Sequence, residues 1–95
     1  MSEEDAKADI MDKIERLYSI VNRARFYRDV AMESEWSNLM KEVESLRVEM
    51  KLAADEVEKL ADDLDEYYIS GSSAYGETDP LTHWADIIYQ RLFKT

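Results

Sequence analysis

The chain has 95 residues, no cysteine and a formal net charge of −10 at pH 7, from 22 acidic and 12 basic side chains. The absence of cysteine excludes disulfides and thiolate catalysis. The acidic charge argues against direct binding to nucleic acid or to an anionic membrane, because both attract basic surfaces. A protein with a basic surface is therefore the expected partner. A chain of this length supports one core, so we predict one helical domain over residues 1–95.

The first helix is predicted over residues 3–31. Ser2 can cap it, and three acidic residues follow at the positive end of the helix dipole. One apolar face is formed at helical spacing by Ile10, Ile14, Leu17 and Val21. A second apolar patch lies on the opposite side of the helix. If the chain forms a homodimer, we expect this patch to be the interface, formed by Ile20, Tyr27 and Val30.

The longest periodic stretch runs from Trp36 to Tyr67. Apolar residues recur there at alternating steps of three and four with no Gly or Pro between them, which predicts one helix over residues 35–69. The positions beside this seam are acidic on one side and mostly small on the other, where Ala54 and Ala61 lie. A parallel coiled-coil dimer needs basic residues opposite such acids. The pattern therefore favours a helix that packs against two neighbours in a bundle.

The connection between these two helices leaves two interpretations. No Gly or Pro lies between residues 30 and 36, so one interpretation is a single rod about 95 Å long. The other is a hairpin that turns near residues 31–35. The apolar registers on the two sides differ by one residue, and Ser34 can cap a new helix. Both observations favour the hairpin.

The C-terminal segment combines a loop with a short helix. Residues 70–79 hold both glycines and three serines, which is typical of a loop. Asp79 can then cap a helix over residues 80–93, with Pro80 at its first position. The predicted fold class is all-α, a long antiparallel helical hairpin plus a short C-terminal helix. Such a chain is a three-helix bundle, and its dimerisation is left open.

Most of the negative charge lies in the second half of the predicted hairpin. Residues 33–69 carry twelve acids and four bases. In a hairpin, Arg23, Arg25 and Arg28 would neutralise the acids of residues 35–44, and the remaining acids would form an acidic pole beside the N-terminus. We expect this pole to bind the partner through Asp55, Glu56, Glu58, Asp62, Asp63, Asp65 and Glu66, with Tyr68 and Tyr75 beside them. The alternative interpretation is a solvated face that only maintains solubility.

The sequence does not indicate catalytic or metal-binding chemistry. No nucleophile with a base, phosphate-binding glycine loop or pair of catalytic carboxylates can be picked out. His83 shares a helix face with Asp79 and Asp86, but Asp79 is needed as a cap, which makes a poor metal site. We predict no enzyme activity, no cofactor and no metal. A cytoplasmic location is expected, because the acidic start lacks signal-peptide features and no apolar run could span a bilayer.

Three functions fit these patterns. The first, which we favour, is an acidic module that inhibits or regulates a protein with a basic surface. An immunity protein, an antitoxin or a phage-encoded inhibitor acts in this manner, and imitation of nucleic-acid charge is one form of it. The second is a structural protein that forms homo-oligomers as a coiled coil or bundle. The third is a small chaperone or secretion adaptor that holds a partner's helix in a groove.

Overall fold

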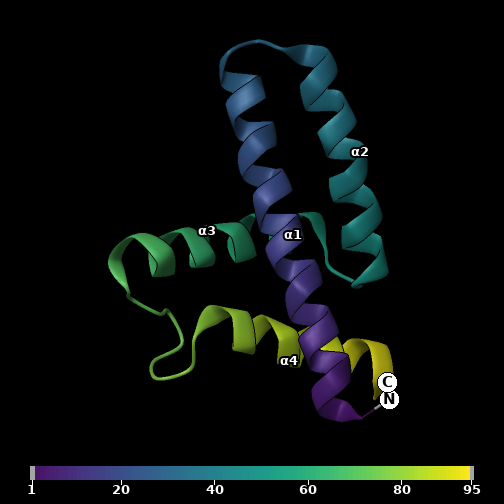
Figure 1. The fold of residues 1–95 in the computed structure, drawn as a ribbon, viewed down its shortest axis with the longest axis vertical. Helices are drawn as coiled ribbons and strands as arrows, with labels where there is room; N and C mark the ends of the chain where they lie inside the picture. The colour runs from purple at the N-terminus through teal and green to yellow at the C-terminus, as the bar shows by residue number, and fades with distance from the viewer. Residues whose placement is uncertain (1, 95) are drawn as a thin grey trace.

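Residues 2–94 are described by a computed structural model, and every regular element within them is an α-helix (Figure 1). The predicted all-helical fold class is confirmed. The predicted number of helices is wrong, because four are present within this range where the sequence pattern indicates three. They are α1 (Glu3–Asp29), α2 (Glu33–Glu49), α3 (Ala54–Ser70) and α4 (Pro80–Phe93).

The helix α1 is the axis on which the others pack. Its 27 residues give a length of about 40 Å at 1.5 Å per residue, close to the longest dimension of the molecule, 42 Å. Helix α2 runs antiparallel along the C-terminal half of α1, α3 crosses α1 near its middle, and α4 crosses its N-terminal half (Figure 1). The molecule therefore consists of two antiparallel helix pairs, α1 with α2 and α3 with α4, which meet along α1.

The core lies where α3 and α4 cross α1. Seven of its side chains have no exposed surface, and the five large ones are Ile14, Leu17, Leu60, Leu64 and Ile88. They come from three helices, and full burial of one such side chain contributes about 1.5–3 kcal/mol. The crossing of these three helices is thus the most completely packed part of the molecule.

Side chains that the sequence marks as caps begin two of the helices. The Ser2 hydroxyl accepts a hydrogen bond from the backbone N–H of Asp5 at 3.1 Å, which starts α1. The Asp79 carboxylate accepts one from the backbone N–H of Thr82 at 2.7 Å, which starts α4 with Pro80 in the first turn. Each cap satisfies a backbone donor that has no partner inside its helix.

The turn between α1 and α2 is a Schellman motif without glycine. The backbone N–H of Met32 donates to the carbonyl of Tyr27 at 2.9 Å, and that of Ala31 donates to the carbonyl of Arg28 at 3.1 Å. Ala31 has a φ of 59°, in the left-handed region. This geometry ends α1 at Asp29, two residues before the predicted boundary, and reverses the chain within three residues.

The predicted helix over residues 35–69 is wrong, because the chain breaks it with a second motif of the same kind. The N–H of Leu52 donates to the carbonyl of Arg47 at 2.9 Å, and Lys51 has a φ of 56°. In a continuous helix Leu52 would lie on the outer side of the seam, exposed to water. The break instead buries it, leaving 2 % of its surface exposed. Burial of Leu52 and Met50 is the physical gain that accompanies the break.

The predicted acidic pole at the open end of a hairpin is therefore wrong. Because α3 turns away after residue 53, its acids do not lie level with the start of α1. The start of α1 faces α4 instead: Lys7 pairs with Asp86 at 3.0 Å, and Glu3 lies 4.0 Å from Lys94. The N-terminal acids and the acids of α3 belong to different parts of the surface.

The predicted dimer patch of Ile20, Tyr27 and Val30 is not a continuous exposed surface. Ile20 is 4 % exposed and belongs to the core, so its assignment to an interface is wrong. Tyr27 is half-buried against the same core, and Val30 alone is largely exposed. The second apolar patch of α1 is largely covered in the fold, because more than one helix packs on α1.

Candidate protein-binding surfaces

Helix α3 holds all seven acidic residues of the predicted binding surface, but they divide into two groups. Four make side-chain contacts within the molecule, namely Glu56, Asp62, Asp63 and Asp65. The other three are exposed, and none of the ion pairs found among residues 2–94 involves Asp55, Glu58 or Glu66. The acids of α3 are therefore partly structural and partly free to meet a partner.

Asp63 and Tyr75 fix the loop before α4. The Asp63 carboxylate accepts a hydrogen bond from the Tyr75 hydroxyl and another, at 2.9 Å, from the indole Nε1 of Trp84, which is 3 % exposed. Burial, and then the hydrogen bond to Asp63, raise the pKa of Tyr75 to about 12. The Tyr75 ring stacks on His83, with centroids 3.5 Å apart. These contacts give both predicted site residues a structural role.

Glu56 joins the linker between α2 and α3 to α4. Its carboxylate forms a two-pronged ion pair with Arg91, both contacts at 2.7 Å, and accepts the backbone N–H of Ala53 at 2.9 Å. The Arg91 guanidinium, and then the Ala53 N–H, lower the pKa of Glu56 to about 2. Arg91 also donates to the carbonyl of Lys51 at 3.0 Å. Glu56 thus stabilises the break that the sequence pattern does not show.

Arg25 of α1 pairs with acids of α3, not with those of α2. Its guanidinium lies 3.2 Å from Asp62 and 3.5 Å from Asp65. The Tyr18 hydroxyl donates to Asp65 at 2.5 Å, and burial followed by this bond raises the pKa of Tyr18. The expected pairing of the three α1 arginines with the acids of residues 35–44 is wrong, since none of the ion pairs found among residues 2–94 joins them. Because α3 crosses α1 and does not continue α2, its acids lie beside Arg25.

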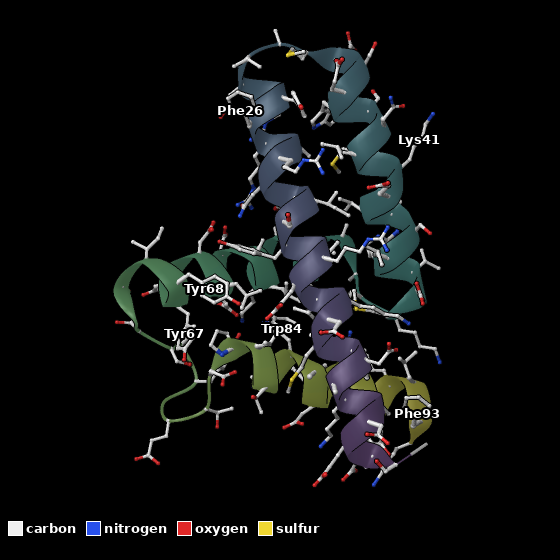
Figure 2. All side chains as sticks on the ribbon, in the orientation of Figure 1. Phe26, Lys41, Tyr67, Tyr68, Trp84 and Phe93 are labelled. Carbon is white, nitrogen blue, oxygen red and sulfur yellow. The ribbon has the colours of Figure 1, made fainter. Side chains whose placement is uncertain are left out.

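The outward side of α3 forms what we name the acidic face. Its members are spaced by three, four and four residues, which places them in one row on a helix: Asp55, Glu58, Asp62 and Glu66. Beyond this row, Ile69 is 85 % exposed and Tyr68 is 51 % exposed. Figure 2 shows Tyr68 on α3, with Tyr67 pointing from α3 toward the loop before α4. The Tyr68 ring packs on Tyr18, with centroids 5.5 Å apart.

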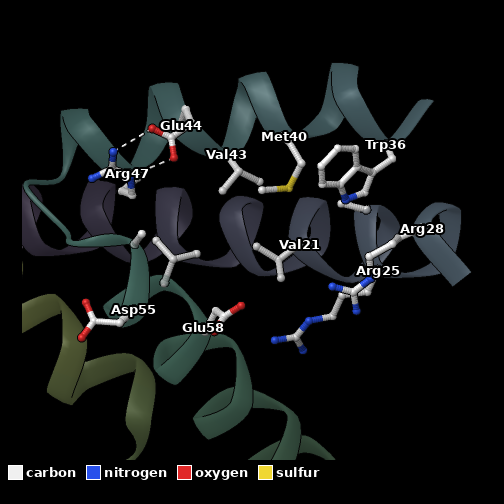
Figure 3. Close-up of a pocket in the computed structure, with 13 residues that line it drawn as sticks. Val21, Arg25, Arg28, Trp36, Met40, Val43, Glu44, Arg47, Asp55 and Glu58 are labelled. Carbon is white, nitrogen blue, oxygen red and sulfur yellow. Dashed lines mark hydrogen bonds and ion pairs between the residues drawn. The ribbon is translucent and has the colours of Figure 1, made fainter. Parts of the chain in front are cut away.

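A groove separates α2 from α3, and its volume is about 430 Å³ (Figure 3). Buried side chains of three helices form its floor, namely Val21, Ala24, Val43 and Val57. Trp36 and Met40 of α2, both half-buried, form one wall, and Asp55 and Glu58 of α3 form the other. The sequence pattern does not indicate this groove, because it exists only where the chain breaks after α2. The one sequence feature that could have indicated the break is Leu52, a large apolar residue that lies off the predicted seam.

Comparisons of the chain with protein-family models, with curated proteins and with solved structures give no match. Within residues 2–94, no three His, Cys, Asp or Glu side chains gather as metal ligands would. No helix in the described range has the length and apolar character needed to cross a membrane. The acidic face and the groove are the two surfaces from which a function can be argued.

Proposed function

We propose that the protein is a binding module that inhibits or regulates a protein with a basic surface, and that the acidic face of α3 makes the contact. The observation that carries this proposal is the row of exposed carboxylates from Asp55 to Glu66, which the exposed Ile69 continues three residues later, with the half-exposed Tyr68 on the adjacent side of α3. Binding interfaces combine charged groups, which set the approach and the orientation, with an exposed apolar or aromatic anchor. The acidic face has both parts within one helix.

The stability of α3 does not account for this row. The C-terminal end of a helix carries a partial negative charge, which disfavours acidic residues there by a few tenths of a kcal/mol each. Helix α3 nevertheless places Glu66 one turn before its end and has no basic residue in its last turn. None of the ion pairs found among residues 2–94 involves Glu66, which supports a role outside the fold.

The charge density of the acidic face fits a partner with a few separate basic side chains better than it fits imitation of a nucleic acid. From Asp55 to Glu66 the row spans about 16 Å of helix and holds four carboxylates. A DNA duplex carries roughly ten charges over that length. A surface with a few Lys or Arg residues, about 5 Å apart, matches the acidic face more closely.

The proposal can be tested by affinity capture from cells of the native host, followed by titration of the captured protein. The parent chain should retain a basic protein that is released as the salt concentration rises, because exposed charges are screened. The double variant Asp62→Lys with Glu66→Lys should lose this protein. Circular dichroism should show unchanged helix content, since both side chains are exposed.

A matched control separates the acidic face from net charge alone. Glu42→Lys with Glu77→Lys makes the same change in charge at exposed positions on α2 and in the loop. This control should bind the captured protein as the parent does. Equal loss in both double variants would mean that only overall charge matters, and undiminished binding by the α3 variant would refute the proposed contact.

A further inference from the structure

The groove between α2 and α3 leaves one side of the α1–α2 pair without a helix. Helix α2 packs on α1, whereas α3 crosses α1 and departs from α2 after the linker (Figure 1). Trp36 and Met40 consequently remain half-buried on the open side, above a floor of buried valines. Two antiparallel helices with an open apolar side are half of a four-helix bundle.

We propose that a second copy of this chain fills the groove, with its own α1–α2 pair placed antiparallel about a two-fold axis. Four of the five groove residues of α2 follow one another at spacings of four, three and four, namely Trp36, Met40, Val43 and Arg47. They form one stripe about 16 Å long, which is three helical turns. A helix of 17 residues, the length of α2 itself, covers such a stripe. The two stripes then pack against each other as the inner faces of one bundle.

The charge on the groove selects the second copy and its direction. Arg25 and Arg28 lie at the end near the α1–α2 turn, while the other end holds Asp55, Glu58 and the ion pair of Arg47 with Glu44, a net charge of −2 (Figure 3). A two-fold axis with antiparallel helices brings the basic end of each copy to the acidic end of the other. A parallel arrangement would place like charges together. The groove is therefore complementary to itself in one orientation, as a two-fold interface requires.

The distribution of net charge permits this association. Residues 21–50, which form the turn and most of the α1–α2 pair, hold five bases and six acids, a net charge of −1. The other residues carry the remaining −9 of the total of −10. Repulsion between two copies is thus smallest where the groove lies.

The proposed dimer does not rest on the proposed function, but it covers Asp55 and Glu58, which line the groove, and leaves only the outer half of the acidic face open to a partner. Glu66, Tyr68 and Ile69 are not among the groove residues, nor is Asp62. A dimer would present two such surfaces at once, which increases the apparent affinity for a partner with two basic sites.

Sedimentation equilibrium on the full chain and three variants tests the proposal. The parent should be a dimer at micromolar concentration. Arg28→Glu and Glu58→Arg should each weaken dimerisation on the order of tenfold or more, because each places like charges across the interface. An equimolar mixture of the two variants should regain the dimer, since their reversed charges complement each other. Lys41→Glu, on the outer side of α2, should leave dimerisation unchanged (Figure 2).

Arg28, Glu58 and Lys41 are all exposed, so circular dichroism should match the parent in every variant. A parent that stays monomeric at hundreds of micromolar would overturn the proposal and leave the groove to a helix of another protein. Failure of the mixture to dimerise would exclude the antiparallel arrangement. Glu66→Lys alone changes a residue that lies outside the groove and forms none of the ion pairs found among residues 2–94. This variant should dimerise normally, so failure of the proposed function and failure of this inference give different results.

Discussion

The two helix pairs of this molecule are held together by different kinds of interaction. Side-chain hydrogen bonds and ion pairs join α3 and its flanking segments to α4, through Asp63 with Trp84 and Glu56 with Arg91. Between α1 and α2, the ion pair found in the described range is that of Lys13 with Glu49, at 2.7 Å. The α1–α2 pair relies on apolar packing, and that packing is incomplete beside the groove.

This difference shows why the number of acidic residues on a helix does not measure a binding surface. Four of the seven acids of α3 serve to attach α4 and the loop, or to meet residues of α1. The other three are exposed and, with the Arg25-paired Asp62, form the acidic face. Residues 21–50, whose net charge is only −1, contribute most of the residues that line the groove.

The largest difference should appear between Leu64→Ala and Met40→Ala. Leu64 has no exposed surface, so its truncation leaves a cavity and should lower the free energy of unfolding by about 3 kcal/mol. Met40 lines the open groove and is half-buried, so its truncation should cost about 1 kcal/mol. Urea denaturation, followed by circular dichroism, measures both. Equal losses would mean that the groove is packed as tightly as the core.

The next effect concerns the polar attachment of α4. Asp63→Ala removes the acceptor of both Tyr75 and the buried Trp84 N–H, and should destabilise the fold by about 2 kcal/mol. Glu77→Ala, at an exposed position in the same loop, should change stability by less than about 0.5 kcal/mol. Unfolding in urea again gives the values. A loss at Asp63 no greater than that at Glu77 would show that the hydrogen bonds of Asp63 do not help to position α4.

The sequence predicted the helical class and the caps of α1 and α4 because those depend on local patterns. The predicted Ser34 cap is wrong, since α2 begins at Glu33, after Met32, with no side-chain cap. Ser2 and Asp79 act on the backbone three residues away, so their role can be inferred without the fold. The break after Met50 could not be inferred in this way. Met50 and Val57 are seven residues apart and both buried, which is what a continuous seam would also require. No glycine marks the turn, since Lys51 adopts the left-handed conformation itself.

The candidate site was predicted in part, for the same reason. Its acids lie on one helix as expected, but which of them remain exposed depends on partners that are distant in sequence. Arg25 reaches Asp62 across 37 positions, and Arg91 reaches Glu56 across 35. Such pairs follow from the direction that α3 takes after the break. The groove depends on that direction entirely.

The pair of Glu56 with Arg91 should make stability depend on pH in the acid range. The pKa of Glu56 is lowered from 4.5 to about 2 in the folded chain. Its contribution is therefore complete above about pH 5 and is lost as the pH falls toward 2. Because both side chains are partly exposed, at 25 % for Glu56 and 36 % for Arg91, we expect only about 1 to 2 kcal/mol.

Glu56→Gln isolates this contribution. At pH 7 the variant should be less stable than the parent by the amount above, and the difference should shrink as the pH is lowered from 5 to 2. Urea denaturation at a series of pH values measures the two curves. A difference that stays constant down to pH 2 would assign the effect to lost packing or to the hydrogen bond with the Ala53 N–H, not to the ion pair.

The smallest effect we expect is a gain in stability at the turns. Ala31 and Lys51 hold left-handed conformations, with φ of 59° and 56°, which cost a side chain about 1 kcal/mol relative to glycine. Ala31→Gly should therefore stabilise the fold by somewhat less than this, since glycine also makes the unfolded chain more flexible. Lys51→Gly should gain less, because the Lys51 Nζ contact with the Arg91 carbonyl, at 3.3 Å, is lost. Gly71→Ala, at a φ of 75° after α3, is the opposite change and should destabilise by about 1 kcal/mol. A loss of stability of Ala31→Gly in thermal and urea unfolding would mean that the left-handed conformation of Ala31 does not strain the turn between α1 and α2.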